Sequence, residues 1–392
     1  MMKTNAEGTK KESHSDTSFS AGSLRAARRA AGAVQHAVDC VLVGRHRNAF
    51  CVVRPPGHHA GIKGLLAGGE SCGFCIFNNV AAGALHAISD ERLMCQRCAI
   101  VDIDVHHGNG TEEIVKQYHD PGKLFFFSIH LYDADKRKSG YSFYPGTGDE
   151  DSLAHNIINV PIAPLWRETA QPALVSGMPA QPSTHNTRHK AKHKATSTAS
   201  STASTPMEGS VDGDESPDVV AADAMLESDT VSDTASIRGS ASGRSPKGQP
   251  NSPRYNTAGR HAYRKAVQSR LLPALRAFNP DLILISAGFD AAKGDVGNAR
   301  HFAGGKESMG LDLEPEDYAW TTRKIMEIAD ICCQGRVVSV LEGGYGRSPT
   351  QIADSNQMQS LDKAFFSECA IRHLHGMVDP YDLEARFPSE KS

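Results

Sequence analysis

The amino-acid sequence predicts an α/β fold in which a mainly parallel central sheet is covered by helices on both faces. The first observation is a series of short apolar runs typical of buried parallel strands, at residues 49–53, 99–103, 124–129, 282–286 and 337–341. The second is helical patterning between these runs, over residues 78–88, 257–278 and 315–333. Strands that alternate with helices in this way predict crossover connections between parallel strands.

Length and composition limit the class of protein. The chain has 392 residues, 39% of them hydrophobic, and a formal net charge of -3. This length can bury one sizeable core or two small ones. Because no stretch approaches the roughly 18 to 20 apolar residues of a membrane span, and the polar start MMKTNAEGTKKESHSD has no signal-peptide apolar region, we expect no membrane association. The near-neutral charge does not favour direct nucleic-acid binding, and nine scattered cysteines indicate reduced thiols.

The sequence predicts one domain over residues 19–392, after a disordered N-terminus at residues 1–18. Apolar residues recur at helical spacing at the start of this domain, which predicts an amphipathic helix that contains Leu24, Ala27, Ala31, Val34, Val38 and Val41. Residues 168–255 are rich in Ser, Thr, Ala, Gly and Asp and nearly free of aromatic side chains. Such a composition cannot bury enough apolar surface to fold, so we expect a disordered insertion that interrupts the domain.

Polar clusters follow four of the five predicted strands. They occupy residues 54–59, 102–110, 286–290 and 342–345. Because open parallel sheets bind ligands outside the carboxyl ends of their strands, we expect the functional residues to gather there.

Two of these clusters contain the components of a metal site. Asp104 and His106 are two residues apart, so on an extended strand end their side chains point to the same face. Asp290 is the candidate for a third ligand. One nitrogen and two carboxylates suit zinc, and three protein ligands leave one position open, as catalytic zinc sites do. The alternative is that Asp and His at a strand end only cap the next helix.

Other polar residues in these clusters are candidates for acid-base chemistry. His58 and His59 lie in a loop rich in glycine and proline, where two imidazoles that titrate near neutrality can exchange protons with a reacting group. Asp102 and Asn109 are the candidates to accept a ring N–H from each histidine and fix its tautomer. Tyr345 lies among glycines and can donate its hydroxyl to an oxyanion, although an ordinary loop aromatic is the alternative.

Six motifs occur along the chain in a fixed order: RPPGHHA, CGFC-x-FNN, VDIDVHHGNGT, FYPGTGD, ISAGFDA and LEGGYG. Through these motifs the chain resembles the zinc-dependent histone deacetylases, and most closely their class II branch. Asn109 stands where class I members have aspartate, which favours class II. The resemblance implies a three-layer arginase-like fold. It also implies a hydrolase that converts N-acetyl-lysine of histones or other proteins to lysine and acetate, and thereby represses transcription through chromatin.

The resemblance also implies roles for individual residues. Zinc would be held by Asp104, His106 and Asp290. The proton-transfer pair would be His58 and His59, with Asp102 behind the first and Asn109 behind the second. Tyr345 would hold the acetyl carbonyl. The acetyl-lysine tube would be lined by Gly73, Phe74, Tyr144 and Gly344. A structural K+ would lie near Asp102, Asp104, the His106 carbonyl, Ser128 and Ile129.

The resemblance implies acetylated histone tails or other acetyl-lysine proteins as partners, in the nucleus and cytoplasm, with membership of a corepressor complex as a further hypothesis. Several alternatives stay open. One alternative has tubulin or an acetylpolyamine as the substrate, and another has the fold serve as a non-catalytic scaffold subunit. A zinc ribbon is another hypothesis, built on Cys72, Cys75, Cys95 and Cys98. The histidines at 185, 189 and 193 are expected to form a solvated run.

Overall fold

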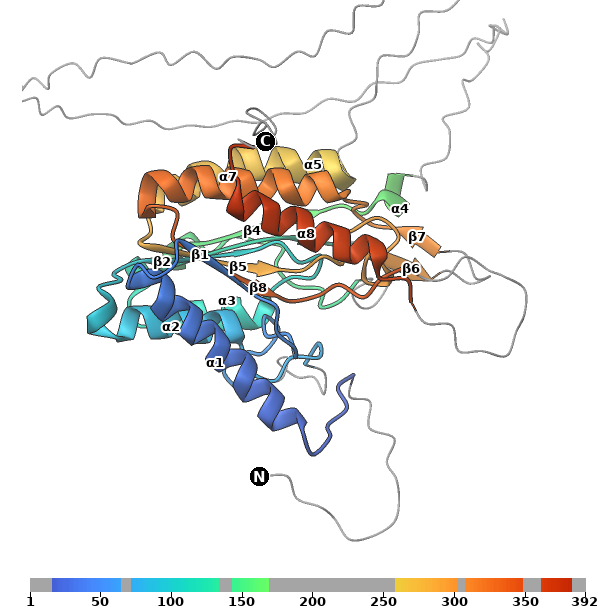
Figure 1. Ribbon diagram of the computed structural model, residues 1–392. Helices are drawn as coiled ribbons and strands as arrows, with labels where there is room; N and C mark the ends of the chain where they lie inside the picture. The colour runs from blue at the N-terminus through green and yellow to red at the C-terminus, as the bar shows by residue number, and fades with distance from the viewer. Residues whose placement is uncertain are drawn as a thin grey trace, which may run out of the picture. The chain divides into compact units, whose positions relative to one another are not determined.

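The structure of the protein is a computed structural model that describes residues 16–64, 72–133, 143–168, 258–301, 307–347 and 361–382 (Figure 1). Its centre is a sheet of six parallel strands. In spatial order they are β1 (Asn48–Cys51), β8 (Val337–Leu341), β5 (Leu282–Ala287), β2 (Cys98–Asp102), β3 (Leu124–Leu131) and β4 (Ile157–Ile162). The five predicted strands are therefore confirmed, and one strand was not predicted.

The unpredicted strand, β4, contains a proline. Pro161 cannot donate a backbone hydrogen bond, so a proline is compatible with a strand only at a sheet edge or bulge. In the structure β4 is the edge strand, and Pro161 is exposed opposite His130 of β3. The proline therefore concealed the strand in the sequence and is tolerated because of its edge position.

One face of the sheet is covered by α1 (Ser23–Leu42), α2 (Asn79–Ser89) and α3 (Asn109–Gln117) (Figure 1). Val34 and Val38 of α1 belong to the same buried cluster as Leu284 of β5. Gly83 allows α2 to approach closely, because a Cβ there would lie 2.7 Å from a Val34 methyl. The predicted amphipathic helix is thus confirmed as α1.

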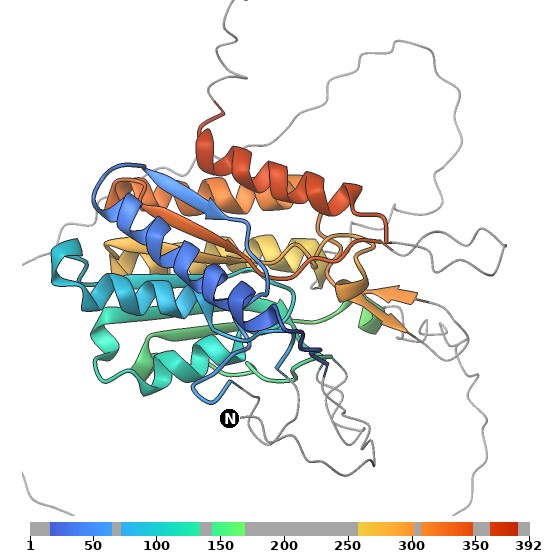
Figure 2. The ribbon, with the colours of Figure 1, turned by 60° about the horizontal axis from the view of Figure 1, so that its bottom comes forward.

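The other face carries α5 (Gly259–Ala266), α6 (Leu272–Phe278), α7 (Pro315–Cys333) and α8 (Ala364–Val378), so the fold has the three layers of an arginase-like α/β protein (Figures 1 and 2). The predicted helix over 257–278 is interrupted by a π-helical stretch, Val267–Leu271. Pro273, in the first turn of α6, explains this interruption, because a proline ring clashes with the carbonyl four residues earlier in a regular α-helix. Neither α3 nor α8 was predicted.

The remaining elements are short. They are α4 (Leu165–Glu168), β6 (Ala299–His301), β7 (Glu307–Met309) and the 3-10 turns Glu91–Leu93, Pro121–Lys123, Leu153–His155 and Val296–Asn298. The predicted insertion at 168–255 lies, beyond Glu168, outside the described residues, as does the predicted N-terminal segment before Asp16. Both domain boundaries stay predictions. Among the helices that the structure describes, none has the length and apolar character needed to traverse a membrane.

Apolar side chains on the two faces of the sheet separate the core into two clusters. In β2, Ala99 and Val101 belong to the cluster under α5–α8, whereas Ile100 belongs to the cluster under α1 and α2. This alternation follows from the two-residue period of a strand. Since all six strands run in parallel, their carboxyl ends share one edge, and the loops that follow them carry the polar clusters.

Candidate active site

The predicted metal ligands converge at this edge of the sheet. Asp104 and His106 follow β2, and Asp290 follows the neighbouring strand β5. One ligand atom from each residue lies within 4.8 Å of the other two. His106 Nδ1 lies 3.0 Å from Asp104 Oδ1 and 3.1 Å from Asp290 Oδ2. The three side chains therefore face one point. The alternative that Asp104 and His106 only cap the next helix is not supported.

The reason given for this convergence from the sequence needs a correction. β2 ends at Asp102, so Asp104 and His106 do not lie on an extended strand end. They lie in a bend in which Asp104 Oδ1 accepts a hydrogen bond of 2.8 Å from the His106 N–H. The side chain of an aspartate that binds the backbone two residues on makes a local turn. This turn, rather than strand alternation, brings the two ligands together.

Backbone N–H groups hold the free carboxylate oxygens of the site. Asp104 Oδ2 accepts from Gly343 N at 2.8 Å, and Asp290 Oδ1 accepts from Val105 N at 3.0 Å. Gly343 has to be glycine for steric reasons, because a Cβ there would lie 2.5 Å from Asp104 Oδ2 and closer still to Asp290 Oδ2. The main chain after β8 thus approaches both carboxylates directly.

The donor set fits a zinc ion. Ligand atoms about 2.0 to 2.2 Å from a tetrahedral ion lie about 3.5 Å from one another, which is close to the separations found here. Asp104 and Asp290 are fully buried, whereas the His106 side chain is 14% exposed, so the site reaches the surface on one side. Two buried carboxylates side by side need a compensating positive charge. Burial lowers the pKa of His106, but the neighbouring Asp290 and Asp104 raise it, and the result is about 9.

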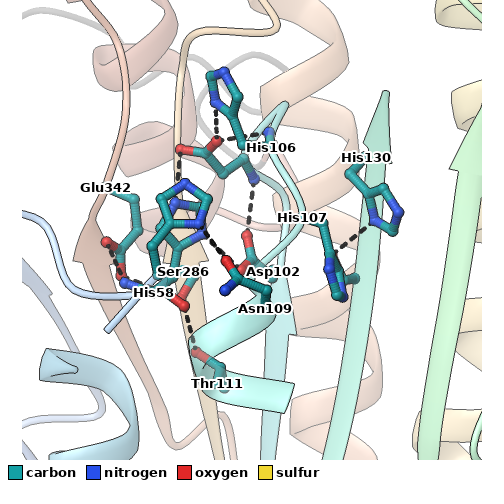
Figure 3. A network of polar contacts seen from close by, with 12 residues as sticks. His58, Asp102, His106, His107, Asn109, Thr111, His130, Ser286 and Glu342 are labelled. Carbon is teal, nitrogen blue, oxygen red and sulfur yellow. Dashed lines mark hydrogen bonds and ion pairs between the residues drawn. The ribbon is translucent and has the colours of Figure 1, made fainter. Parts of the chain in front are cut away.

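Each histidine of the predicted proton-transfer pair has the partner that was predicted for it, and Figure 3 shows His58 beside Asp102. His58 Nδ1 donates to Asp102 Oδ2 at 2.9 Å, and His59 Nδ1 donates to Asn109 Oδ1 at 2.7 Å. The two rings are 4.0 Å apart between centroids, and His58 Nε2 lies 3.9 Å from Asp104 Oδ2. The Nε2 atoms of both rings are therefore left for the substrate side.

The two histidines differ in electrostatic environment. Burial opposes the charge on both rings, but Asp102 and Asp104 raise the pKa of His58 well above its usual value. Burial and the neighbouring His58 lower the pKa of His59 well below its usual value. A pair of titratable groups with opposite shifts is typical of acid-base sites.

Tyr345 lies near the metal ligand Asp290, because both pack around Gly297. A Cβ added at Gly297 would lie 2.8 Å from Asp290 Cβ and 2.9 Å from Tyr345 Cε2. The Phe74 ring meets the Tyr345 ring edge-on, with centroids 6.1 Å apart. Burial raises the pKa of Tyr345, which keeps its hydroxyl protonated and able to donate.

Three of the four residues predicted to line the tube, Gly73, Phe74 and Tyr144, lie near His59 or Tyr345. The Tyr144 ring meets the ring of His59 edge-on at 5.0 Å, and Phe74 is 43% exposed at the surface. Gly73 has a φ of +53° and lies so close to His59 that no side chain would fit. Gly344 has a φ of +126° and contacts the Phe366 ring instead.

Phe143 was not predicted as a site residue, although it precedes Tyr144. Its ring stacks on His106, with centroids 5.0 Å apart and planes 6° apart. The aromatic pair in FYPGTGD was the available signal. Asp16 was also missed: its carboxylate accepts from Gly73 N at 3.0 Å and Cys72 N at 3.3 Å, and no local pattern in the sequence links residues so far apart.

A second buried network holds the loop that carries Phe143 and Tyr144. His107 lies 2.8 Å from Thr147 Oγ1 through Nδ1 and 2.9 Å from Glu112 Oε2 through Nε2. His130 Nε2 donates to the Gly148 carbonyl at 3.0 Å. Two buried histidines therefore fix the FYPGTGD loop against β2 and β3.

The residues predicted for potassium lie at the base of the site. Asp102 pairs with Ser128 in the register of β2 and β3, and both are fully buried. Asp102 Oδ1 accepts from Asp104 N at 3.1 Å, and Ser128 Oγ lies 3.0 Å from His130 Nδ1. Buried oxygen atoms suit a hard cation. The potassium site, which also includes Ile129, stays a prediction.

The zinc-ribbon alternative finds no support in the structure. All four of its cysteines are buried free thiols, and the groups of possible metal ligands found among the described residues contain none of them. Cys98 starts the central strand β2, and α2 lies between the two cysteine pairs. The histidines at 185, 189 and 193 lie outside the described residues.

A buried cluster of two carboxylates and an imidazole, next to paired histidines and a tyrosine, is an arrangement that metal-dependent hydrolases use. The sequence profile of the family described as "Histone deacetylase domain" matches residues 1–178 and 228–359, so the chain belongs to this family. The family expected from the motifs is thus confirmed. Membership supports a deacetylase function for this domain.

Individual relatives agree with this assignment. The chain is 40% identical over 330 residues to type-2 histone deacetylase 1 of Dictyostelium discoideum, which covers 84% of this chain and 19% of the relative. It is 30% identical over 369 residues to type-2 histone deacetylase 2 of the same organism, covering 94% of this chain and 15% of the relative. Histone deacetylase 15 of Arabidopsis thaliana is 29% identical, over 84% of this chain and 38% of the relative.

A solved structure confirms the fold. The crystal structure of the HDA15 HD domain matches with a TM-score of 0.54 and 25% identity, covering 93% of this chain and 66% of that chain. The chain spans well under half of the length of each of the three curated relatives quoted above.

Proposed function

We propose that the chain is a zinc-dependent lysine deacetylase that hydrolyses the acetyl amide of N-acetyl-lysine in histone tails and other proteins. The observation that carries this proposal is the convergence of Asp104, His106 and Asp290 beside the two paired histidines. The proposed enzyme belongs to the hydrolases that act on linear amide C–N bonds.

In this proposal each group of the site has a distinct task. Asp104, His106 and Asp290 would hold a zinc ion, which would supply Lewis acidity toward the acetyl carbonyl and toward water. The histidine pair takes a proton from the water that adds to the carbonyl carbon. As the C–N bond breaks, the pair returns a proton to the lysine amine, and acetate is the second product.

Tyr345 is suited to stabilise the carbonyl oxygen while it carries negative charge. Its hydroxyl stays protonated because burial raises its pKa, and its ring packs around Gly297 together with Asp290. Phe74 and Tyr144 would flank the four methylenes of the lysine stem, since the Phe74 ring meets Tyr345 and the Tyr144 ring meets His59. A K+ ion near Asp102 and Ser128 would stabilise the base of the site.

The wider role is also part of the proposal. Relatives that carry the name histone deacetylase support histone tails as substrates. Repression of transcription through chromatin, membership of a corepressor complex, and residence in nucleus and cytoplasm are proposed on the same grounds. The absence of direct nucleic-acid binding is proposed because the formal net charge is only -3.

The test is deacetylation by purified protein of three substrates: an acetylated histone H4 peptide, acetylated tubulin and an acetylpolyamine. We expect the peptide to be hydrolysed fastest, activity to be lost with a chelator and regained with one equivalent of Zn2+. Tyr345→Phe is expected to lower kcat by about 10²- to 10³-fold, as for other lost oxyanion donors, with zinc content unchanged. Zinc-loaded wild-type protein that is inert toward all three substrates would contradict the proposal and favour a scaffold role.

A further inference from the structure

Two buried carboxylates lie beside the site without belonging to the metal ligands or the histidine partners. Glu342 is 0% exposed and Asp295 is 2% exposed. In the described part of the chain, neither forms an ion pair with a lysine or arginine. An unpaired buried carboxylate is costly unless hydrogen bonds compensate it, so the bonds that each one accepts indicate what it does.

Glu342 accepts from the loop that carries the proton-transfer pair (Figure 3). Its Oε2 accepts from Gly57 N at 2.6 Å and from His58 N at 3.2 Å. Its Oε1 accepts from the Ser286 hydroxyl at 3.2 Å. A residue at the end of β8 therefore holds the main chain that follows β1.

Asp295 makes the corresponding contacts on the other wall. Its Oδ2 accepts from Tyr345 N at 2.9 Å and from Gly346 N at 2.6 Å. Its Oδ1 accepts from Gly297 N at 2.8 Å, and Gly297 is the residue against which the Tyr345 ring lies. The loop after β5 thus holds both the main chain and the ring of Tyr345.

We propose that Glu342 and Asp295 are positioning residues, each of which places one half of the catalytic machinery through main-chain N–H groups of another loop. Glu342 places the histidine pair, and Asp295 places the Tyr345 hydroxyl. The assignment of catalytic roles rests on the proposed function, whereas the hold on each loop does not. Because a catalytic group displaced by about 1 Å can cost about 10²-fold in rate, both residues should control turnover without contacting the substrate.

The kinetic test is a double-mutant cycle with Tyr345→Phe. If Asp295 acts through the Tyr345 hydroxyl, Asp295→Leu together with Tyr345→Phe should be within about 3-fold of Tyr345→Phe alone. Glu342→Leu acts on the other half, so its effect should multiply with that of Tyr345→Phe. Multiplicative loss in the Asp295 cycle would overturn the proposal.

Conservative variants separate position from charge. In Glu342→Gln the amide oxygen can still accept from Gly57 and His58, while the NH2 group donates to the Ser286 hydroxyl. We expect the kcat of Glu342→Gln to be at least about 10-fold higher than that of Glu342→Leu, because displacement of a catalytic group alone can lower the rate by about 10²-fold. Equal damage in the two variants would show that charge, and not positioning, is what Glu342 contributes.

A readout that does not need activity keeps failure of the positioning idea apart from failure of the proposed function. Amide hydrogen exchange is measured on full-length, zinc-loaded variants. Asp295→Leu should speed exchange at Tyr345 and Gly346 while Gly57 and His58 stay as in the wild type, and Glu342→Leu should do the reverse. The control is Asp317→Asn, because Asp317 is a buried carboxylate that accepts from the Glu314 amide at the start of α7 and pairs with Arg260 and Arg264, so it holds neither of the two loops. Equal loosening of both loops in either variant would refute the proposal even if the wild type lacks deacetylase activity.

Discussion

Gly343 offers the most direct test of how the metal site is built. Replacing it by alanine adds one methyl group beside both carboxylate ligands. The new Cβ would lie 2.5 Å from Asp104 Oδ2, whereas real Cβ atoms essentially never approach closer than 3.0 Å. Asp290 Oδ2 would lie closer still, at 2.1 Å, so an oxygen or the main chain must move by about 0.9 Å, whereas ligand distances in metal sites tolerate only about 0.2 Å.

We expect Gly343→Ala to weaken zinc binding by about 10- to 100-fold, the usual effect of disturbing the groups that orient metal ligands. The assay is competition for Zn2+ against a chromophoric chelator, with folding checked by circular dichroism. Gly32→Ala is the matched control, because Gly32 is exposed on α1 with no atom within 4 Å of the added methyl. Unchanged zinc affinity in Gly343→Ala, with the fold intact, would show that the carboxylates are not held as described here.

Three further outcomes concern stability and the tube. Burial lowers the pKa of His373 to about 3, below its unfolded value, so its contribution to stability is complete above pH 6.5 and is lost as the pH falls toward 3. The free energy of unfolding of wild type should thus fall relative to His373→Asn by about 1.4 kcal/mol per pH unit in that window, measured by urea titration, and parallel curves would contradict this. Phe126→Ala, in the core between β3 and the helices α1 and α2, should cost about 3 to 5 kcal/mol in the same assay, and a loss below about 1 kcal/mol would be inconsistent with its full burial. His107→Phe removes the bond to Thr147 and should raise KM for an acetyl-lysine peptide more than it lowers kcat, because the FYPGTGD loop carries Tyr144, which is proposed to flank the lysine stem. An unchanged KM would speak against that role.

The sequence predicted those parts of the fold and site that have a local pattern. Five strands were evident because each is a continuous apolar run, and the metal ligands were evident because Asp104 and His106 are close neighbours at a strand end. The edge strand β4 was missed because Pro161 interrupts its pattern. The bend at Asp104 was missed because a side chain that binds its own backbone leaves no periodic signal.

Contacts between distant segments were the least accessible to sequence reasoning. Glu342 ends an otherwise apolar run, which marks it as unusual, but nothing in the sequence shows that its partners are Gly57 and His58. Asp16 likewise binds the main chain of Gly73 across a long stretch of sequence. Such pairs are set by the order of strands in space, which apolar patterning alone does not specify.

The interleaved order of the sheet has a consequence for how the protein acquires its structure. β5 and β8, from the second half of the chain, lie between β1 and β2 from the first half. An N-terminal fragment that ends before β5 would therefore expose two open strand edges and hold Asp104 and His106 without Asp290. Folding must wait until the late strands enter the middle of the sheet, and such long-range pairing is intrinsically slow. Metal capture should accordingly be among the last events, and it would report that the two halves have joined.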